Sequence, residues 1–182
     1  MKTPLRIITV LVLTLSIGLF VLSIVLRLGG FYINTTPSLP VGLYQIVDEP
    51  VSKGSYVAFC PPQSDAFDWT VTRGYINSGD CPGGTGQLLK RVYAVAGDTV
   101  LIDETGITVN GQWLPNSAPL FTDAYGAALP QYRFNAVLGE FEYLLLSDLN
   151  PRSFDARYFG VIERAQIVHV VRPIFTFNLQ KE

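Results

Sequence analysis

The stretch Asn34-Thr35-Thr36-Pro37-Ser38-Leu39-Pro40-Val41-Gly42-Leu43-Tyr44 organises the rest of the chain. It places one serine between two prolines, directly before an apolar run that predicts a strand. Proline fixes its own φ and favours extended geometry at the residue before it, so we expect Ser38 to sit on stiff backbone. A serine hydroxyl is a weak nucleophile unless a neighbouring base accepts its proton. Another part of the sequence has to supply that base.

A long apolar run precedes this stretch. Ile7 to Leu26 carries no charge and is bracketed by Arg6 and Arg27, and about 20 apolar residues are enough for a helix to cross a bilayer. A cleaved secretory signal is the alternative, but it needs a short apolar core and a small-x-small cleavage site, which Leu26 to Gly30 does not supply well. We expect a membrane anchor rather than a cleaved signal.

The anchor divides the chain into two predicted parts, a cytoplasmic tip and helix over residues 1–28 and one domain over residues 29–182. Lys2 and Arg6 favour a cytoplasmic amino terminus by the positive-inside rule, and Arg27 opposes it with one charge. The balance predicts a single-pass protein of a bacterial inner membrane, with its domain on the periplasmic side.

The composition narrows the class of partner. Three of the 13 Lys and Arg residues precede Gly29, whereas all 15 Asp and Glu residues follow it, so residues 29–182 carry a net charge of about −5. A domain that is acidic and has no basic stripe argues against nucleic acid as a partner. The 48% hydrophobic content is normal for a folded core.

The two cysteines, Cys60 and Cys81, stand at the ends of a segment rich in Gly, Pro, Ser and Asp. Outside the cytoplasm a disulfide between them is favoured, and closing such a loop contributes about 3 kcal/mol in the chain-entropy model. Two buried free thiols are the alternative. One histidine, His169, and two distant cysteines make a zinc site unlikely. We expect no metal and no cofactor, although a carboxylate-only magnesium or calcium site stays open.

Short strand-like runs separated by turn residues predict a mainly β domain. The strongest run is Gln87 to Val95, and Asn110-Gly111 is a hairpin signal. Residues 61–87 read as an inserted loop or small subdomain with Phe67 and Trp69 as isolated apolar groups, and residues 115–140 read as irregular. The predicted strands are residues 43–47, 55–60, 87–95, 99–102, 106–109, 112–114, 142–147 and 167–177, the last interrupted by Pro173.

Lys90 is the best candidate base. Side chains alternate along a strand, so Lys90 shares a face with Leu88, Val92 and Ala94, while Arg91 points to the other side. Burial disfavours the charged amine and lowers its pKa, and a neutral amine near Ser38 is then a general base. The alternative for Lys90 alone is a lysine whose ammonium reaches solvent.

His169 offers a second route to an activated serine. It lies in the apolar run Ile167 to Val171, where a histidine is more often a core or edge residue than a catalyst. A Ser-His-Asp triad is recognised by geometry rather than by sequence order, so this alternative stays open.

Three boxes resemble the signal peptidase I family. Thr36 to Tyr44 is similar to its nucleophile box, Leu88 to Val100 to its lysine box, and Ser153-Phe154-Asp155-Ala156-Arg157-Tyr158-Phe159-Gly160 to its C-terminal box. The forms Ser-Leu-Pro-x-Gly-Leu-Tyr and Ser-Phe-Asp-x-Arg-Tyr-Phe-Gly resemble the TraF-type branch, the conjugal transfer peptidases that process pilin precursors. The resemblance runs from the anchor to near residue 164. It implies a signal-peptidase-like fold of short antiparallel strands.

The resemblance also implies roles for particular residues. Ser38 corresponds to the nucleophile, Lys90 to the general base, and Asp155 to the acidic residue of the C-terminal box. Supporting roles fall on three further residues. Ser153 is expected to orient the lysine, Arg157 to pair with Asp155, and Thr36 to add a hydroxyl to the oxyanion hole. Ser147-Asp148-Leu149-Asn150 departs from the Gly-Asp-Asn lead-in of general signal peptidases, and Ala156 replaces a common serine.

The sequence thus predicts a membrane-anchored serine endopeptidase with a Ser-Lys dyad. The expected substrate is a pilin or secreted-protein precursor, cleaved after a small residue through an acyl-enzyme and in the TraF-type branch sometimes cyclised. A non-catalytic, membrane-tethered β-domain that scaffolds a conjugation or secretion assembly is the first alternative. A self-cleaving LexA-like protein is the second, but the chain shows no DNA-binding module.

Overall fold

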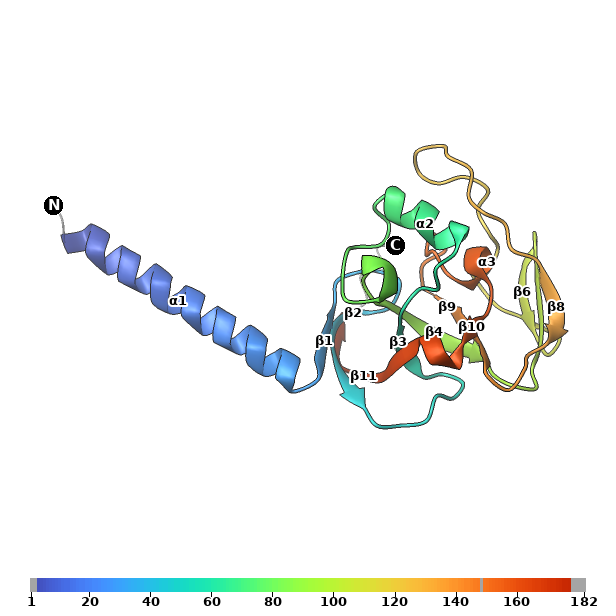
Figure 1. Cartoon of the computed structure of the whole chain (residues 1–182), viewed down its shortest axis with the longest axis horizontal. Helices are drawn as coiled ribbons and strands as arrows, with labels where there is room; N and C mark the ends of the chain where they lie inside the picture. The colour runs from blue at the N-terminus through green and yellow to red at the C-terminus, as the bar shows by residue number, and fades with distance from the viewer. Residues whose placement is uncertain (1–2, 148, 178–182) are drawn as a thin grey trace.

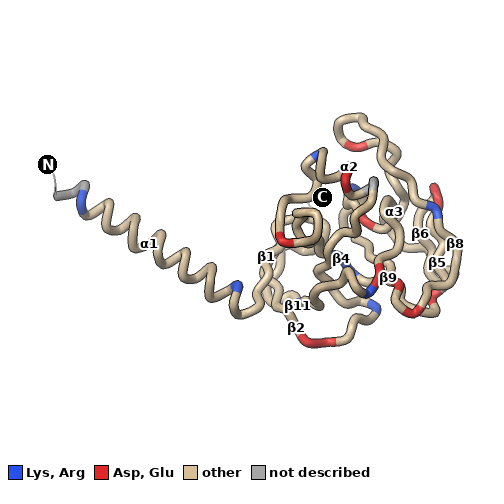
Figure 2. Tube along the Cα trace, in the orientation of Figure 1, with Lys and Arg blue, Asp and Glu red and all other residues tan. Residues whose placement is uncertain are grey.

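Helix α1 (Thr3–Leu28) projects away from the rest of the molecule in the computed structural model, which describes residues 3–147 and 149–177 (Figure 1). Its stretch Arg6–Leu28 is long and apolar enough to cross a membrane. Figure 2 shows basic residues near the two ends of the helix and none between them. The hydroxyls of Thr14 and Ser23 donate to carbonyls of the preceding turn, so these polar groups are satisfied within the helix.

The rest of the described chain is built mainly of antiparallel strands, which confirms the predicted fold class. One sheet has seven strands in the order β1-β2-β11-β3-β4-β9-β10, and a second has four in the order β7-β6-β5-β8. The strands of the larger sheet are β1 (Phe31–Asn34), β2 (Val41–Val47), β11 (Ile167–Phe177), β3 (Tyr56–Phe59), β4 (Leu88–Ala94), β9 (Glu142–Leu146) and β10 (Ile162–Glu163). Those of the smaller are β7 (Gln112–Trp113), β6 (Gly106–Val109), β5 (Thr99–Asp103) and β8 (Phe134–Val137).

Two hydrophobic clusters hold the sheets together. One lies around β3, β4 and β11 and includes Phe59, Val92 and Leu145, and the other joins β9 to the smaller sheet through Ile102 and Leu144. Strand β11 runs antiparallel to both β2 and β3, and its register to β2 shifts between Pro173 and Phe175. This irregularity lies where the sequence predicted an interruption, because proline cannot donate to a sheet ladder.

The segment 61–87 is more ordered than its composition predicted. It contains helix α2 (Asp65–Thr72) and a 3-10 turn, η1 (Pro82–Gly84). Phe67 is not an isolated apolar group, because it lies in the core cluster together with Ile76. The disulfide between Cys60 and Cys81 is present, with Cα atoms 5.5 Å apart.

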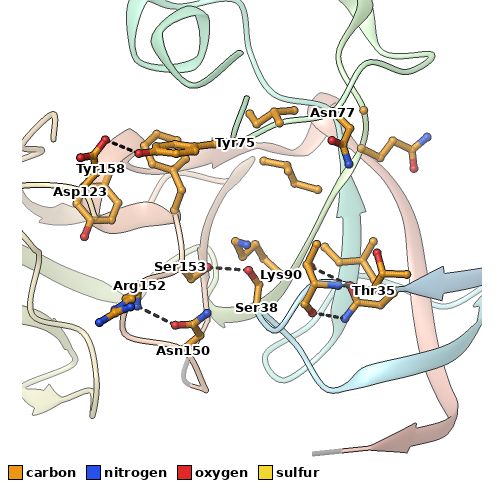
Figure 3. A pocket seen from close by; sticks show the side chains of 18 of the residues that line it. Thr35, Ser38, Tyr75, Asn77, Lys90, Asp123, Asn150, Arg152, Ser153 and Tyr158 are labelled. Atoms are coloured by element: carbon orange, nitrogen blue, oxygen red, sulfur yellow. Dashed lines mark hydrogen bonds between the residues drawn. The ribbon is translucent and has the colours of Figure 1, made fainter. Parts of the chain in front are cut away.

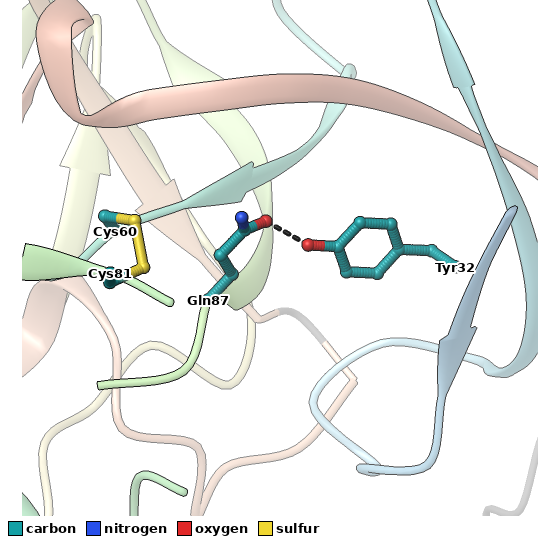
Figure 4. Close-up of a disulfide and its surroundings, with 4 residues drawn as sticks. All are labelled: Tyr32, Cys60, Cys81 and Gln87. Atoms are coloured by element: carbon teal, nitrogen blue, oxygen red, sulfur yellow. Dashed lines mark hydrogen bonds between the residues drawn. A yellow bond between two sulfur atoms is a disulfide. The ribbon is translucent and has the colours of Figure 1, made fainter. Parts of the chain in front are cut away.

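Figure 4 shows this disulfide beside Gln87, whose side-chain oxygen accepts a hydrogen bond from the Tyr32 hydroxyl. Tyr32 lies in β1, the first strand after the anchor. The segment 61–87 is therefore tied at one end by a covalent bond and at the other to the strand that enters the domain.

The expectation that residues 115–140 are irregular is wrong at one point, because strand β8 lies within them and pairs with β5. Its side chains are mostly exposed, so the run lacks the alternation of a half-buried strand. Two further short helical pieces were not predicted, α3 (Ala156–Phe159) and η2 (Arg164–Gln166). Helix α3 packs against β9 and carries the C-terminal box.

Candidate active site

A cleft of about 810 Å³ brings together the three boxes that the sequence singled out. Ser38, Lys90 and Ser153 line it, and Figure 3 shows their side chains next to one another. The other walls come from residues 32–36 at the end of β1, residues 75–77 and 86–89 of the segment before β4, residues 120–129, and residues 150–154. Ser38 of the nucleophile box and Lys90 of the lysine box, more than 50 positions apart in sequence, therefore face one space.

Asn34 holds the backbone that carries Ser38. Its buried side chain donates to the carbonyls of Thr36, Leu39 and Pro40 at 3.0–3.1 Å. Its Oδ1 accepts from the backbone N–H of Thr36 at 3.1 Å and from the hydroxyl of the same residue at 2.9 Å. The prolines of this loop have no N–H to donate, so the Asn34 side chain satisfies carbonyl groups that a strand would otherwise pair. These hydrogen bonds fix the turn around Ser38.

Two further serines contact Ser38 directly. The Ser147 hydroxyl donates to the carbonyl oxygen of Ser38 at 2.5 Å, and the Ser153 hydroxyl donates to Ser38 Oγ at 3.1 Å. Because Ser38 Oγ accepts from Ser153, its own proton stays available for a base. These contacts orient both the backbone and the side chain of Ser38.

Lys90 is buried, with an exposed fraction of only 3%. It lies on the inward face of β4 with Val92 and Ala94, as the alternation of the sequence predicted. The pKa of Lys90 is lowered to about 8, chiefly because burial desolvates the charged amine; the carboxylate of Asp155 opposes this change and the guanidinium of Arg157 adds to it. Burial therefore leaves about a tenth of this amine neutral at pH 7, whereas a lysine with its ordinary pKa is almost entirely protonated there.

Asp155 and Arg157 form a fully buried ion pair beneath the cleft. Arg157 Nε donates to Asp155 Oδ1 at 2.7 Å and Nη2 donates to Oδ2 at 2.8 Å, a bidentate geometry. Asp155 is also the N-cap of α3 and accepts the backbone N–H of Ser147 at 3.1 Å. Despite its burial, the pKa of Arg157 is raised, chiefly because the hydrogen bonds and charge of Asp155 outweigh desolvation. The predicted pairing of these two residues is present.

The remaining donors of Arg157 bind carbonyl oxygens of the loops around the site. Nη1 donates to Pro151 at 2.6 Å and to Asn116 at 3.2 Å, and Nη2 donates to Ser153 at 2.8 Å. The guanidinium therefore fixes the residue whose hydroxyl contacts Ser38. Asp155 and Arg157 act on the position of the site, in addition to the electrostatic influence of Asp155 on Lys90.

One supporting assignment differs from the expectation, and a second is not tested. Ser153 was expected to orient Lys90, but its hydroxyl donates to Ser38 Oγ, so it orients the Ser38 side chain. Thr36 lines the cleft, yet its hydroxyl donates to Asn34, so an oxyanion-hole role for Thr36 stays a prediction. Asn34 and Ser147 were not predicted as site residues. Their partners lie 2 to 109 positions away, and only a three-dimensional structure shows that Ser147 reaches Ser38.

His169 does not line the cleft that Ser38 lines. It faces a separate depression of about 210 Å³ that includes Asp48 and Glu49, on a strand that pairs with β3. Within the described ranges, no group of three or more His, Cys, Asp or Glu side chains is gathered as a metal site. The arrangement around Ser38 is thus one of hydroxyls, one buried amine and one buried ion pair.

Comparison with known proteins agrees with this arrangement. The family described as "Signal peptidase, peptidase S26" matches residues 2–176. A protein of Escherichia coli named "Plasmid transfer protein TraF" is 48% identical over 162 residues, which cover 86% of this chain and 91% of that protein. A "Probable conjugal transfer protein TraF" of Sinorhizobium fredii is 39% identical, with 82% and 79% covered.

A "Conjugal transfer protein TraF" of Agrobacterium fabrum is 36% identical, with 83% of this chain and 85% of that protein covered. A crystal structure of a signal peptidase I from Enterococcus faecalis, 20% identical, covers 67% of this chain and 97% of its own with a TM-score of 0.38, a likeness too low to support a conclusion about function. The family match spans nearly the whole sequence and all three boxes. This chain belongs to the signal peptidase, peptidase S26, family.

Proposed function

We propose that this chain is a membrane-anchored serine endopeptidase in which Ser38 is the nucleophile and Lys90 the general base. The observation that carries the proposal is the burial of Lys90 in the cleft that Ser38 lines, with a pKa lowered to about 8. A buried lysine without a catalytic task is costly and is usually replaced by an apolar residue. A scaffold domain without catalytic activity would gain nothing from burying a lysine at this position.

The reaction follows from the contacts of Ser38. Ser38 Oγ attacks the carbonyl carbon of the substrate while its proton passes to neutral Lys90, and the protonated amine then gives that proton to the leaving amine. The product of this step is an ester between Ser38 and the substrate's acyl group. Lys90 next accepts a proton from the second nucleophile, which is water or the substrate's own amino terminus, as that nucleophile attacks the ester carbon. The bond between this carbon and Ser38 Oγ then breaks, and Lys90 returns the proton to Ser38 Oγ.

Asp155, Arg157 and Ser153 have supporting tasks in this proposal. Arg157 fixes the Ser153 carbonyl, and Ser153 holds Ser38 Oγ at 3.1 Å. A change of about 1 Å in the position of a reacting group is enough to cost about 10²-fold in rate, so such positioning matters. Asp155 contributes by fixing Arg157, although its charge raises the pKa of Lys90 and so opposes the effect of desolvation.

The placement in the cell is part of the proposal. Residues 1–28 anchor the chain in the inner membrane, and residues 29–182 form the peptidase domain in the periplasm. The Cys60–Cys81 disulfide supports an oxidising compartment. The relatives named for plasmid or conjugal transfer support a task in conjugation, with a pilin precursor as substrate.

The test is mass spectrometry of a candidate pilin precursor co-expressed with the full chain. We expect a shortened product with the wild type and a loss of more than about 10³-fold with Ser38→Ala or with Lys90→Met, which keeps the volume of the lysine stem. A product one water lighter than the linear peptide indicates cyclisation, and a linear product indicates hydrolysis. Ser52→Ala, a serine exposed outside the cleft, is the matched control and should leave processing unchanged.

Processing that persists in Ser38→Ala in a clean background shows that Ser38 is not the nucleophile. An unprocessed precursor, together with no acylation of Ser38 by a serine-directed probe, supports the scaffold alternative instead.

A further inference from the structure

Asp123 joins two walls of the cleft that come from distant parts of the sequence. It lies at the tip of the loop 120–129, in which Thr122 and Ala128 form an antiparallel bridge. Its carboxylate contacts Tyr75 and Arg73, which follow helix α2 in the disulfide-closed segment. We name the contact of Asp123 with Tyr75 and Arg73 the clasp.

The two oxygens of Asp123 have separate tasks. Oδ1 accepts the backbone N–H groups of Tyr125 and Ala127, both at 2.8 Å, and so builds the loop tip. Oδ2 accepts from the Tyr75 hydroxyl and lies 2.9 Å from Arg73 Nη2. One atom therefore shapes the loop, and the other attaches it to the opposite wall.

The partners of Asp123 are themselves fixed. The Tyr75 ring packs edge-on against Trp69 of α2 with centroids 5.5 Å apart, and the Arg73 guanidinium lies 5.2 Å above the same indole. The Asp123 side chain is only 5% exposed, and it is charged, because the hydrogen bond from Tyr75 is the largest effect that lowers its pKa, to about 2. The clasp is thus a partly buried, charge-assisted contact rather than a loose surface pair.

The clasp lies away from the nucleophile. Tyr75 and Asp123 both line the cleft, and Figure 3 shows their contact on a different side of it from Ser38 and Lys90. The loop base is held separately, because the Leu120 N–H donates to the Tyr158 hydroxyl at 3.0 Å. Opening the clasp therefore frees the loop tip without releasing the loop base.

We propose that Asp123 is a specificity-determining residue, whose clasp closes the cleft on the side away from Ser38 and limits the length of polypeptide that the cleft admits. This inference rests on the proposed function, since it concerns the substrate of the same site. A small acyl donor reaches Ser38 whether the clasp is closed or open. A long chain has to displace the clasp, so its reaction with Ser38 is slowed.

Asp123→Asn tests the clasp with little change to the loop. The asparagine keeps an Oδ1 acceptor for Tyr125 and Ala127, but it places an NH₂ group opposite the Arg73 guanidinium. Tyr75→Phe removes one hydrogen bond and gives an intermediate effect. Asp103→Asn is the matched control, because Asp103 also accepts the N–H and hydroxyl of Thr105 in a turn but does not line the cleft.

The measurement is the rate of acylation by p-nitrophenyl acetate and by the p-nitrophenyl ester of an eight-residue chain of Ala and Gln. Full-length protein in detergent is used. In Asp123→Asn we expect the rate with the long ester to rise about 5- to 10-fold and the rate with the acetate to stay within twofold. Trp69 fluorescence in a Trp113→Phe background, where Trp69 is the remaining tryptophan, reports independently that the clasp has opened.

A changed Trp69 signal with an unchanged ratio of the two rates overturns the inference but leaves the proposed function standing. If Ser38→Ala and the wild type react equally with the acetate, the proposed function fails. Equilibrium binding of the same eight-residue chain, followed by Trp69 fluorescence, then replaces the rates. In that case, equal affinities of the wild type and Asp123→Asn for this chain overturn the inference about the clasp. Tighter binding by Asp123→Asn supports the inference.

Discussion

Two regions beneath Ser38 each bury a cation, with opposite results. On β4, Lys90 is buried, and its pKa is lowered to about 8, chiefly by desolvation. At the start of α3, Arg157 is buried as deeply, yet the bidentate contact with Asp155 raises its pKa. Burial alone therefore does not decide the charge of a group. The partner decides it: Asp155 keeps Arg157 charged as a fixed structural contact, whereas the lowered pKa of Lys90 suits the proton-accepting role that we propose for it.

The largest effect is expected when Asp155, the partner of Arg157, loses its charge. Asp155→Asn leaves the guanidinium charge buried and uncompensated, and we expect a loss of about 3–5 kcal/mol in the free energy of unfolding. Denaturant unfolding of the purified full chain measures it. Asp48→Asn, an exposed carboxylate, is the control and should stay within about 0.5 kcal/mol. Equal stability of Asp155→Asn and wild type would show that the pair contributes little to the fold.

Removing the desolvated cation, Lys90, should change the free energy of unfolding with the opposite sign. A lysine whose folded pKa is about 8, against a model value of 10.5, destabilises the folded state below pH 8 by about 3 kcal/mol. Lys90→Met should therefore raise the free energy of unfolding at pH 7 by up to about 3 kcal/mol while it abolishes processing.

The pH dependence has a defined direction. Between pH 8 and pH 10.5 the folded state has released the proton that the unfolded state still binds, so wild-type stability rises with pH and its deficit to Lys90→Met shrinks. Lys53→Met, which loses an exposed partner of Asp98, is the control and should lower stability slightly. A Lys90→Met protein less stable than wild type at pH 7 would contradict a desolvated lysine.

The smallest effect is expected at the exposed pair that joins the anchor to the disulfide segment. Arg27 and Asp80 lie 3.1 Å apart with side chains 84% and 86% exposed. Asp80→Asn should change the free energy of unfolding by less than about 0.5 kcal/mol, because water and salt screen such pairs. Thermal unfolding at low and high salt checks this, and a salt-dependent loss above 1 kcal/mol would mean that the pair fixes the anchor.

Much of the fold was predictable because its signals are local. The alternation of β4 gives the inward face of Lys90, and Asn110-Gly111 gives the β6–β7 hairpin. Helix α2 was missed because Asp65 to Thr72 mixes turn formers with β-branched residues, whereas its stability comes from packing Phe67 into the core. Strand β8 was missed because its residues are mostly exposed, so burial left no periodic pattern in them.

The residues of the candidate site also fall into those that the sequence predicted and those that it did not. Ser38, Lys90 and Asp155 lie in boxes that a sequence shows, and the structure brings them to one cleft or directly beneath it. The sequence gives no sign of the contacts that Asn34 and Ser147 make with residues 38 and 39. Short polar residues are common in loops, and their type alone does not tell which distant backbone group they bind. The different partner of Ser153 also depends on side-chain direction, which spacing does not determine.

The place of β11 in the larger sheet bears on how the domain assembles during synthesis. This strand, Ile167–Phe177, lies between β2, which directly follows the nucleophile segment, and β3, which pairs with the strand of the lysine. It is also synthesised after both. A ribosome-bound chain therefore lacks the strand that joins its two reactive halves, and we expect no peptidase activity until that strand has emerged and paired.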